Sequence, residues 1–211
     1  MRQTNERLGT PRAAGIAGIV FAVLMAAAIV LMRIALPEGA GGEDVTVDAG
    51  RRGAVRTALA LLPFAGIAFL WFMGAVREQV GEREDRFVST VFLGSGLVFV
   101  ATLFGSAAAA ATVLEEQHSA FGRHFAYALL TTYAMRMAAV FVLTTSAIGR
   151  RLGVLPRPLV VFGCLAGLTL LVVGADVPWS ELVLPAWALV VGLHILRGRR
   201  GPAGTRPGAR A

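Results

Sequence analysis

The stretch REQVGEREDR, residues 77–86, holds four acids and three arginines between two long apolar runs. Arg77 suits the C-terminus of a preceding helix, and Glu84 and Asp85 suit the N-terminus of a following one. A second polar segment, GRRLGVLPRP at residues 149–158, carries three arginines and no acid. The opposite charges predict contact between the two segments, or with a protein partner. The candidate partner residues are Glu82, Arg83, Glu84, Asp85, Arg86, Arg150 and Arg151. Exposed ion pairs contribute about 0–1 kcal/mol each, so such contacts bias a conformation without holding the fold.

A single arginine, Arg136, interrupts the apolar run Phe125–Ile148. A charge at the centre of a membrane helix costs roughly 2.5–3.5 kcal/mol, so we expect this side chain to face protein or water. Hydroxyl groups one turn away, on Thr132 and Tyr133, are its expected partners, together with those of Ser95 and Thr102 on residues 87–114. Two interpretations remain open: a substrate or anion contact, or a structural arginine that fixes helix register or snorkels.

Small and weakly polar residues recur at helical spacing along residues 87–114. They are Ser95, Phe99, Thr102, Ser106 and Ala109. Such residues let membrane helices approach closely and form hydrogen bonds. The pattern predicts a helix-packing seam, and the alternative is the lining of a polar pore.

Residues for catalysis or metal binding are sparse. His118 and His124 are predicted on one side of the membrane and His194 near the other, so they cannot share one metal ion or haem. Ser95 has glycine neighbours, but no histidine or lysine lies at a matching depth to activate it. No acid is expected in mid-membrane. We therefore predict no enzyme, no cofactor and no metal site.

The elements that position these residues are six apolar runs between charges. They cover residues 13–32, 57–76, 87–114, 125–148, 159–175 and 179–196. A bilayer core about 30 Å thick needs roughly 20 apolar residues as helix, and backbone polar groups in lipid must be satisfied within each segment. The predicted fold is an all-α polytopic transmembrane bundle of about six spans. Residues 1–12 form a cytoplasmic segment, 13–196 the membrane domain, and 197–211 a basic, disordered cytoplasmic tail.

The charge distribution gives the expected orientation. All twenty basic residues are arginine. With the N-terminus inside, fourteen of the twenty lie on the inner side and five on the outer side. Arginine excess belongs to the cytoplasmic face, so both termini are predicted there. The net charge of +7 is therefore a topology signal with some attraction to anionic headgroups, and nucleic acid is not an expected partner.

The stretch LLPFAGIAFLWFMGAVREQVGEREDRFVSTVFLGSGLVFVATLF, residues 61–104, resembles a family of uncharacterised integral membrane proteins of high-GC bacteria. The resemblance covers the second and third runs and the segment between them. It implies a six-helix protein of the bacterial cytoplasmic membrane. The family carries no assigned activity, so no functional residue is transferred from it.

Two functions follow from the sequence. The first is a structural or accessory membrane component that acts through partners at the charged inner segments. The second is a small-solute or ion permease that uses Arg136 and the polar seam. The expected partners are the lipid bilayer, a second copy of the chain, or another membrane protein.

Overall fold

The computed structural model describes residues 11–35, 49–80, 86–115, 125–126, 128–173, 177 and 179–197. All regular elements in this part of the chain are helical. They are α1 (Pro11–Ala35), α2 (Ala49–Val80), α3 (Arg86–Glu115), the π-helix η2 (Leu129–Ala134), α5 (Met135–Arg151), α6 (Arg157–Val172), the short 3-10 helix η4 (Ser180–Leu182) and α7 (Val183–Arg197). The predicted all-α fold is confirmed for these residues.

Five stretches are long and apolar enough to cross a membrane: Ala13–Ile34, Arg52–Glu78, Phe87–Thr112, Leu129–Arg151 and Ser180–Arg197. They correspond to five of the six predicted spans. The remaining prediction, residues 159–175, falls on α6, which is only 16 residues long. At 1.5 Å per residue, α6 extends for about 24 Å, less than a hydrocarbon core of about 30 Å.

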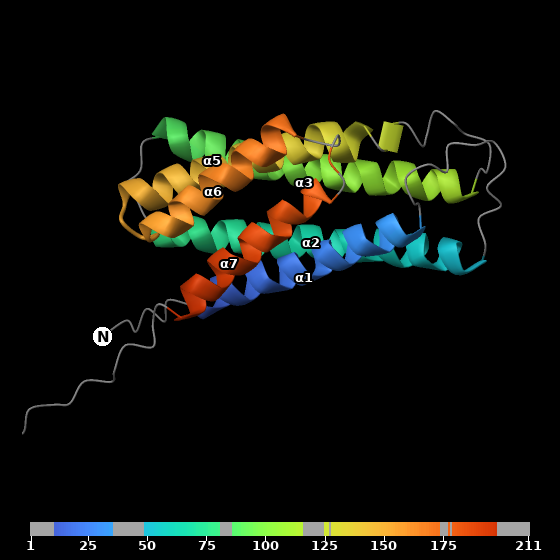
Figure 1. Cartoon of the computed structure of the whole chain (residues 1–211), viewed down its shortest axis with the longest axis horizontal. Helices are drawn as coiled ribbons and strands as arrows, with labels where there is room; N and C mark the ends of the chain where they lie inside the picture. Colours follow the sequence, from blue (N-terminus) through green and yellow to red (C-terminus); the bar gives the residue numbers. More distant parts are fainter. Residues whose placement is uncertain are drawn as a thin grey trace, which may run out of the picture.

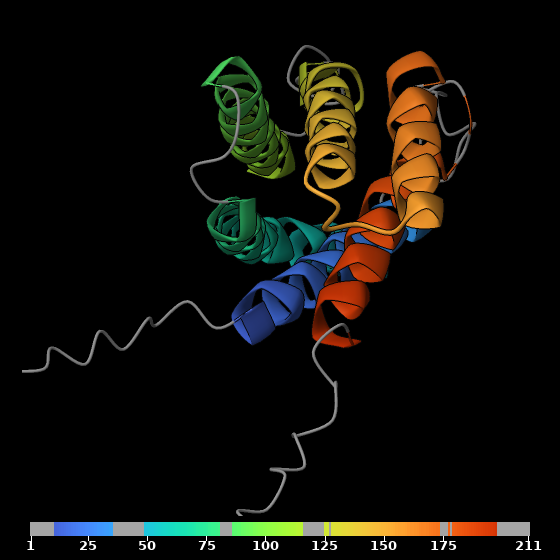
Figure 2. The same cartoon turned by 90° about the vertical axis from the view of Figure 1, so that its left-hand side faces the viewer.

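The six main helices form two layers. In the end-on view, α3, α5 and α6 make one row and α2, α1 and α7 the other (Figure 2). Helix α1 packs between α2 and α7, and α5 packs between α3 and α6. The first residues of α1 and the last of α7 lie at the same end of the bundle (Figure 1).

That end is here named the arginine-rich end. It holds the described arginines Arg77, Arg86, Arg150, Arg151, Arg157 and Arg197, at the ends of α2, α3, α5, α6 and α7. The other end is named the opposite end. Helices α6 and α7 stop short of it, whereas α1, α2 and α3 continue further along the bundle (Figure 1).

Aromatic rings fill the space between the layers. Phe69 of α2 contacts Phe99 of α3 and Phe141 of α5, each at a centroid distance of 4.8 Å. Phe141 also stacks on Phe92 at 4.9 Å, and Trp187 of α7 meets Phe141 edge-on at 6.2 Å. All five side chains are fully buried. Offset and edge-to-face ring pairs add about 0.5–1.5 kcal/mol each beyond their area, so this cluster fixes how the layers pack.

Glycines allow the close packing of α6 on α5. A Cβ atom at Gly163 would contact Ser146 Oγ, and one at Gly167 would lie 2.6 Å from Leu143 Cγ and 3.3 Å from the carbonyl oxygen of Ala139. Small residues of this kind are typical of membrane helix interfaces. The connection between the two helices is short because Gly153 adopts a left-handed φ of 65° just after α5. Glycine at this position ends helices without a steric penalty.

Candidate functional site

The weakly polar face of α3 points into the bundle. Ser95, Phe99 and Ser106 are buried, while Thr102 and Ala109 are partly buried. The hydroxyl groups donate to backbone carbonyls of their own helix: Ser95 to Phe92 at 3.1 Å, Thr102 to Phe99 at 2.9 Å, and Ser106 to Leu103 at 2.8 Å. Gly96 lies on the same face, where an added Cβ would lie 3.2 Å from the ring of Phe141. This geometry supports the packing seam, with aromatic rings against it in place of a polar lining.

Arg136 takes a different position from the expected one. It is exposed on the outside of the bundle, and its Nη1 donates to the carbonyl oxygen of Thr132 at 3.0 Å. The expected contacts with the hydroxyls of Thr132, Tyr133, Ser95 and Thr102 are not formed; Tyr133 is itself 58% exposed. Of the two expected surroundings, protein or water, Arg136 does not take the protein interior, because the packing of α5 against α3 and α6 buries Met135, Ala138 and Ala139 instead.

A π-helical turn precedes Arg136. The N–H of Met135 donates to the carbonyl oxygen of Leu130, five residues back. Such turns insert one residue into an α-helix and are frequent at functional positions. Because each residue of an α-helix turns by about 100°, the insertion rotates the residues before Met135 relative to those after it. Thr131 is thereby buried and Tyr133 turned outward.

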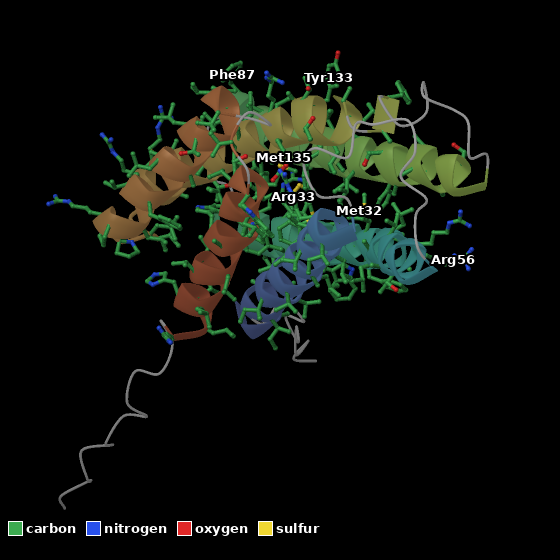
Figure 3. The ribbon with its side chains drawn as sticks, turned by 45° about the vertical axis from the view of Figure 1, so that its right-hand side comes forward. Met32, Arg33, Arg56, Phe87, Tyr133 and Met135 are labelled. Carbon is green, nitrogen blue, oxygen red and sulfur yellow. The ribbon has the colours of Figure 1, made fainter. Side chains whose placement is uncertain are left out.

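The buried charged pair of the bundle is Arg33 with Glu181, which the sequence analysis did not anticipate. The Nη2 atom of Arg33 lies 2.9 Å from Oε1 and 3.0 Å from Oε2 of Glu181. The two side chains are 17% and 8% exposed. The pair joins the last turns of α1 to η4 before α7, and Arg33 points toward Met135 between the layers (Figure 3).

The available signal was an acid inside an apolar run. Glu181 is near the start of the sixth run, and Arg33 directly follows the first. Arg33 is one of the five arginines predicted on the outer side, and Glu181 lies near the end of a run and not in mid-membrane, so neither is a candidate residue in the sequence analysis. A carboxylate retained in an apolar segment needs a partner, and the nearest arginines at the same side were the residues to test.

The chain is strained just before η4. Trp179 has φ of 69° and ψ of 2°, and it is the only non-glycine residue with positive φ in the described part of the chain. Bulky residues rarely adopt this conformation, which costs of order 1–3 kcal/mol. The turn starts α7 with Glu181 buried and leaves Trp179 46% exposed. Trp71 of α2 is also exposed.

One buried donor is unpaired within the described residues: the indole Nε1 of Trp187. It lies 2.9 Å from the point where a Cβ of Gly163 would stand, beside Ser146 Oγ. Ser146 donates to the carbonyl oxygen of Val142 at 2.8 Å and makes no bond to the indole. Trp187 and Ser146 can therefore pack against α6 only because residue 163 is glycine.

Only some of the candidate partner residues lie in the described part of the chain, and these are at the arginine-rich end. Arg150, Arg151 and Arg157 are exposed and flank the single turn between α5 and α6. Arg86 begins α3 at the same end of the bundle. Glu82, Arg83, Glu84 and Asp85 lie outside the described residues, so the predicted bridge between the two segments remains a prediction.

The described residues contain no group of three or more His, Cys, Asp or Glu side chains that could hold a metal ion. His194 is partly buried in the last turn of α7. His118 and His124 lie outside the described residues.

Comparison of the chain with protein-family models, curated proteins and solved structures finds no match. The resemblance of residues 61–104 to a bacterial membrane family therefore remains a prediction. Function has to be inferred from the chain's own residues.

Proposed function

We propose that this chain is a multi-pass protein of the bacterial cytoplasmic membrane that acts as a structural or accessory component, through partners at its arginine-rich end. Support comes first from the bundle interior. The rings of Phe69, Phe99 and Phe141 interlock at its centre, and the seam hydroxyls of α3 are satisfied by their own helix. A bundle filled in this way stabilises itself without a solute pathway through its centre.

The arginine-rich end supplies the partner surface. Arg150 and Arg151 end α5, Arg157 begins α6, and the five residues between the helices contain no acid. The single observation that carries the proposal is this cluster of exposed cations on both sides of one short turn. Val154, 44% exposed, adds an apolar contact at its centre. An acidic surface of another membrane protein matches both features, and electrostatic complementarity of this kind directs partner choice.

The orientation belongs to the same proposal. The concentration of arginines at one end of the bundle favours placing that end in the cytoplasm. The partner would then be reached from the cytoplasmic side, and the 16-residue helix α6 would be the fifth crossing, running outward, with α7 returning as the sixth.

The second candidate is a small-solute or ion permease. It is favoured by one observation, the buried Arg33–Glu181 pair, because ionised groups inside membrane bundles commonly mark ion or substrate pathways. The permease predicted from the sequence uses Arg136 together with the polar face of α3. The structure does not support this use, since Arg136 faces outward and does not contact this face.

Charge reversal at the arginine-rich end tests the proposal. A photocrosslinking amino acid at Val154 of the full chain, in its native membrane, should yield one discrete adduct. Arg150→Glu with Arg151→Glu should reduce that adduct by roughly tenfold or more, because like charges at an interface cost several kcal/mol. The matched control is Arg52→Glu, an exposed arginine at the opposite end, which should leave the adduct unchanged.

Two results would contradict the accessory function. One is an adduct that survives both reversals. The other is the absence of any adduct, together with solute or ion flux when the purified protein is reconstituted in vesicles, which would favour the permease.

A further inference from the structure

Arg136 has hydrogen-bonding capacity that the described chain does not use. A guanidinium group carries five N–H donors, and the hydrogen bond it makes here goes to the carbonyl oxygen of Thr132. Because the side chain is exposed on the outside of α5, the remaining donors face whatever surrounds the bundle. In a membrane that must be an acceptor, since an unpaired cation in hydrocarbon is strongly unfavourable.

The register of α5 and α6 gives the level of Arg136 along the bundle. The two helices are antiparallel, and Gly163 faces Ser146 while Gly167 faces Ala139 and Leu143. Ten residues further along α6 and ten back along α5, this register places Arg136 level with Val173. Val173 is the residue that follows α6. Arg136 therefore lies where α6 ends, and is central only with respect to the longer helices.

Among the six main helices that run along the bundle, α6 is one of the two shortest. Helix α6 rises for about 24 Å from the arginine-rich end, against a hydrocarbon core of about 30 Å. A span too short for the bilayer is accommodated by local thinning, which draws headgroups toward the end of the helix. The side chain of Arg136 points the same way, because its bond to Thr132 runs one turn toward the opposite end of the bundle.

Two exposed aromatic residues are consistent with a headgroup boundary here. Tyr133 is one turn closer than Arg136 to the opposite end, and Trp179 closes the turn that follows α6. Tyrosine and tryptophan are enriched where membrane meets water. Their position near the end of α6 fits a headgroup layer that lies closer than usual to the centre of the membrane.

We propose that Arg136 binds the phosphate group of a phospholipid in the leaflet at the opposite end, with Tyr133 beside it, where the short α6–α7 hairpin thins the bilayer. Planar guanidinium groups bind phosphate oxygens in a bidentate way, and tyrosine adds a donor. The site is independent of the partner proposed for the arginine-rich end.

The test uses the purified full chain in a non-ionic detergent and three variants. Wild-type protein should bind short-chain phosphatidylglycerol, measured by native mass spectrometry and as a rise in the thermal midpoint. Arg136→Leu should weaken binding by about ten- to a hundredfold, the loss expected for a hydrogen bond to a charged group. Arg136→Lys keeps the charge but loses the planar fork, so it should retain part of the binding.

Arg56→Leu is the matched control. Arg56 is an exposed arginine of α2 at the same end of the bundle, and its side chain points away from the helices (Figure 3). It should bind the lipid like wild type. Short-chain diacylglycerol, which has the acyl chains without phosphate, should give no Arg136-dependent effect.

Three results would overturn the proposal. Equal binding by wild type and both Arg136 variants would show that the phosphate is held elsewhere. Equal stabilisation by inorganic phosphate would assign Arg136 to a free anion. A stable dimer of wild type that Arg136→Leu dissociates, without any lipid effect, would place a second copy on this face. Arg136→Lys keeps these outcomes measurable if the leucine variant fails to insert.

Discussion

Replacing Glu181 by leucine is expected to lower the free energy of unfolding by about 3 kcal/mol. The substitution leaves the guanidinium of Arg33, only 17% exposed, facing a leucine in place of its carboxylate. Removing one member of a buried ion pair typically costs about 3–5 kcal/mol, because the remaining charge stays desolvated. The lower end of that range applies here, since Arg33 is near the end of α1 and keeps some contact with the surroundings.

A double-mutant cycle separates the interaction energy of Arg33 and Glu181 from the effects of each substitution alone. Arg33→Leu should also destabilise, but Arg33→Leu with Glu181→Leu should cost much less than the sum of the single changes. Thermal or denaturant unfolding of the purified protein gives the four values. Glu78→Gln is the control, because Glu78 is an exposed acid in the last turns of α2 and its loss should stay within about 0.5 kcal/mol. Additive single effects would show that the two side chains do not interact.

Replacing Phe141 by alanine should destabilise the bundle by a similar amount, about 3 kcal/mol. Its ring contacts Phe69, Phe92 and Trp187, which come from three other helices. Truncating a buried phenylalanine leaves a cavity whose lining loses its contacts, at a cost of about 3–5 kcal/mol in water-soluble proteins. Lipid tails are as apolar as the core, so the transfer part of that cost is smaller in a membrane and the packing part remains.

Phe64→Ala removes the same atoms from a position on α2 that is 62% exposed. It should change stability far less than Phe141→Ala, as measured by unfolding in one detergent. Equal effects of the two variants would mean that the aromatic cluster does not hold the layers together.

The sequence was sufficient for the helices and for the inner face of α3, because both depend on local patterns. Apolar runs between charged residues marked five helices that are long enough to span. The spacing of Ser95, Phe99 and Ser106 marked the buried face, since residues three and four apart share one side of a helix. The run at residues 159–175 corresponds to the shorter helix α6, Arg157–Val172, so length does not decide between five and six spans.

The positions of the charged side chains required tertiary information. The cost of a charge in lipid indicated that Arg136 faces protein or water. Which of the two it faces is set by the face of α5 that packs against the glycines of α6. The π-helical turn at Leu129–Ala134 further shifts the faces of the preceding residues. The Arg33–Glu181 contact joins residues 148 positions apart, and no local pattern specifies such a pair.

Topology of the α6–α7 hairpin tests the central claim most directly, because the six-span bundle requires the short helix α6 to cross. In a Cys164→Ser background, single cysteines at Gly53, Val154 and Val177 would be treated in intact cells with a membrane-impermeant maleimide. All three positions are exposed in the structure. We predict labelling of Gly53→Cys and Val177→Cys from outside, and labelling of Val154→Cys only after the membrane is permeabilised. A Val177→Cys protein that is labelled only after permeabilisation, like Val154→Cys, would show that α6 does not cross and would contradict the six-span bundle.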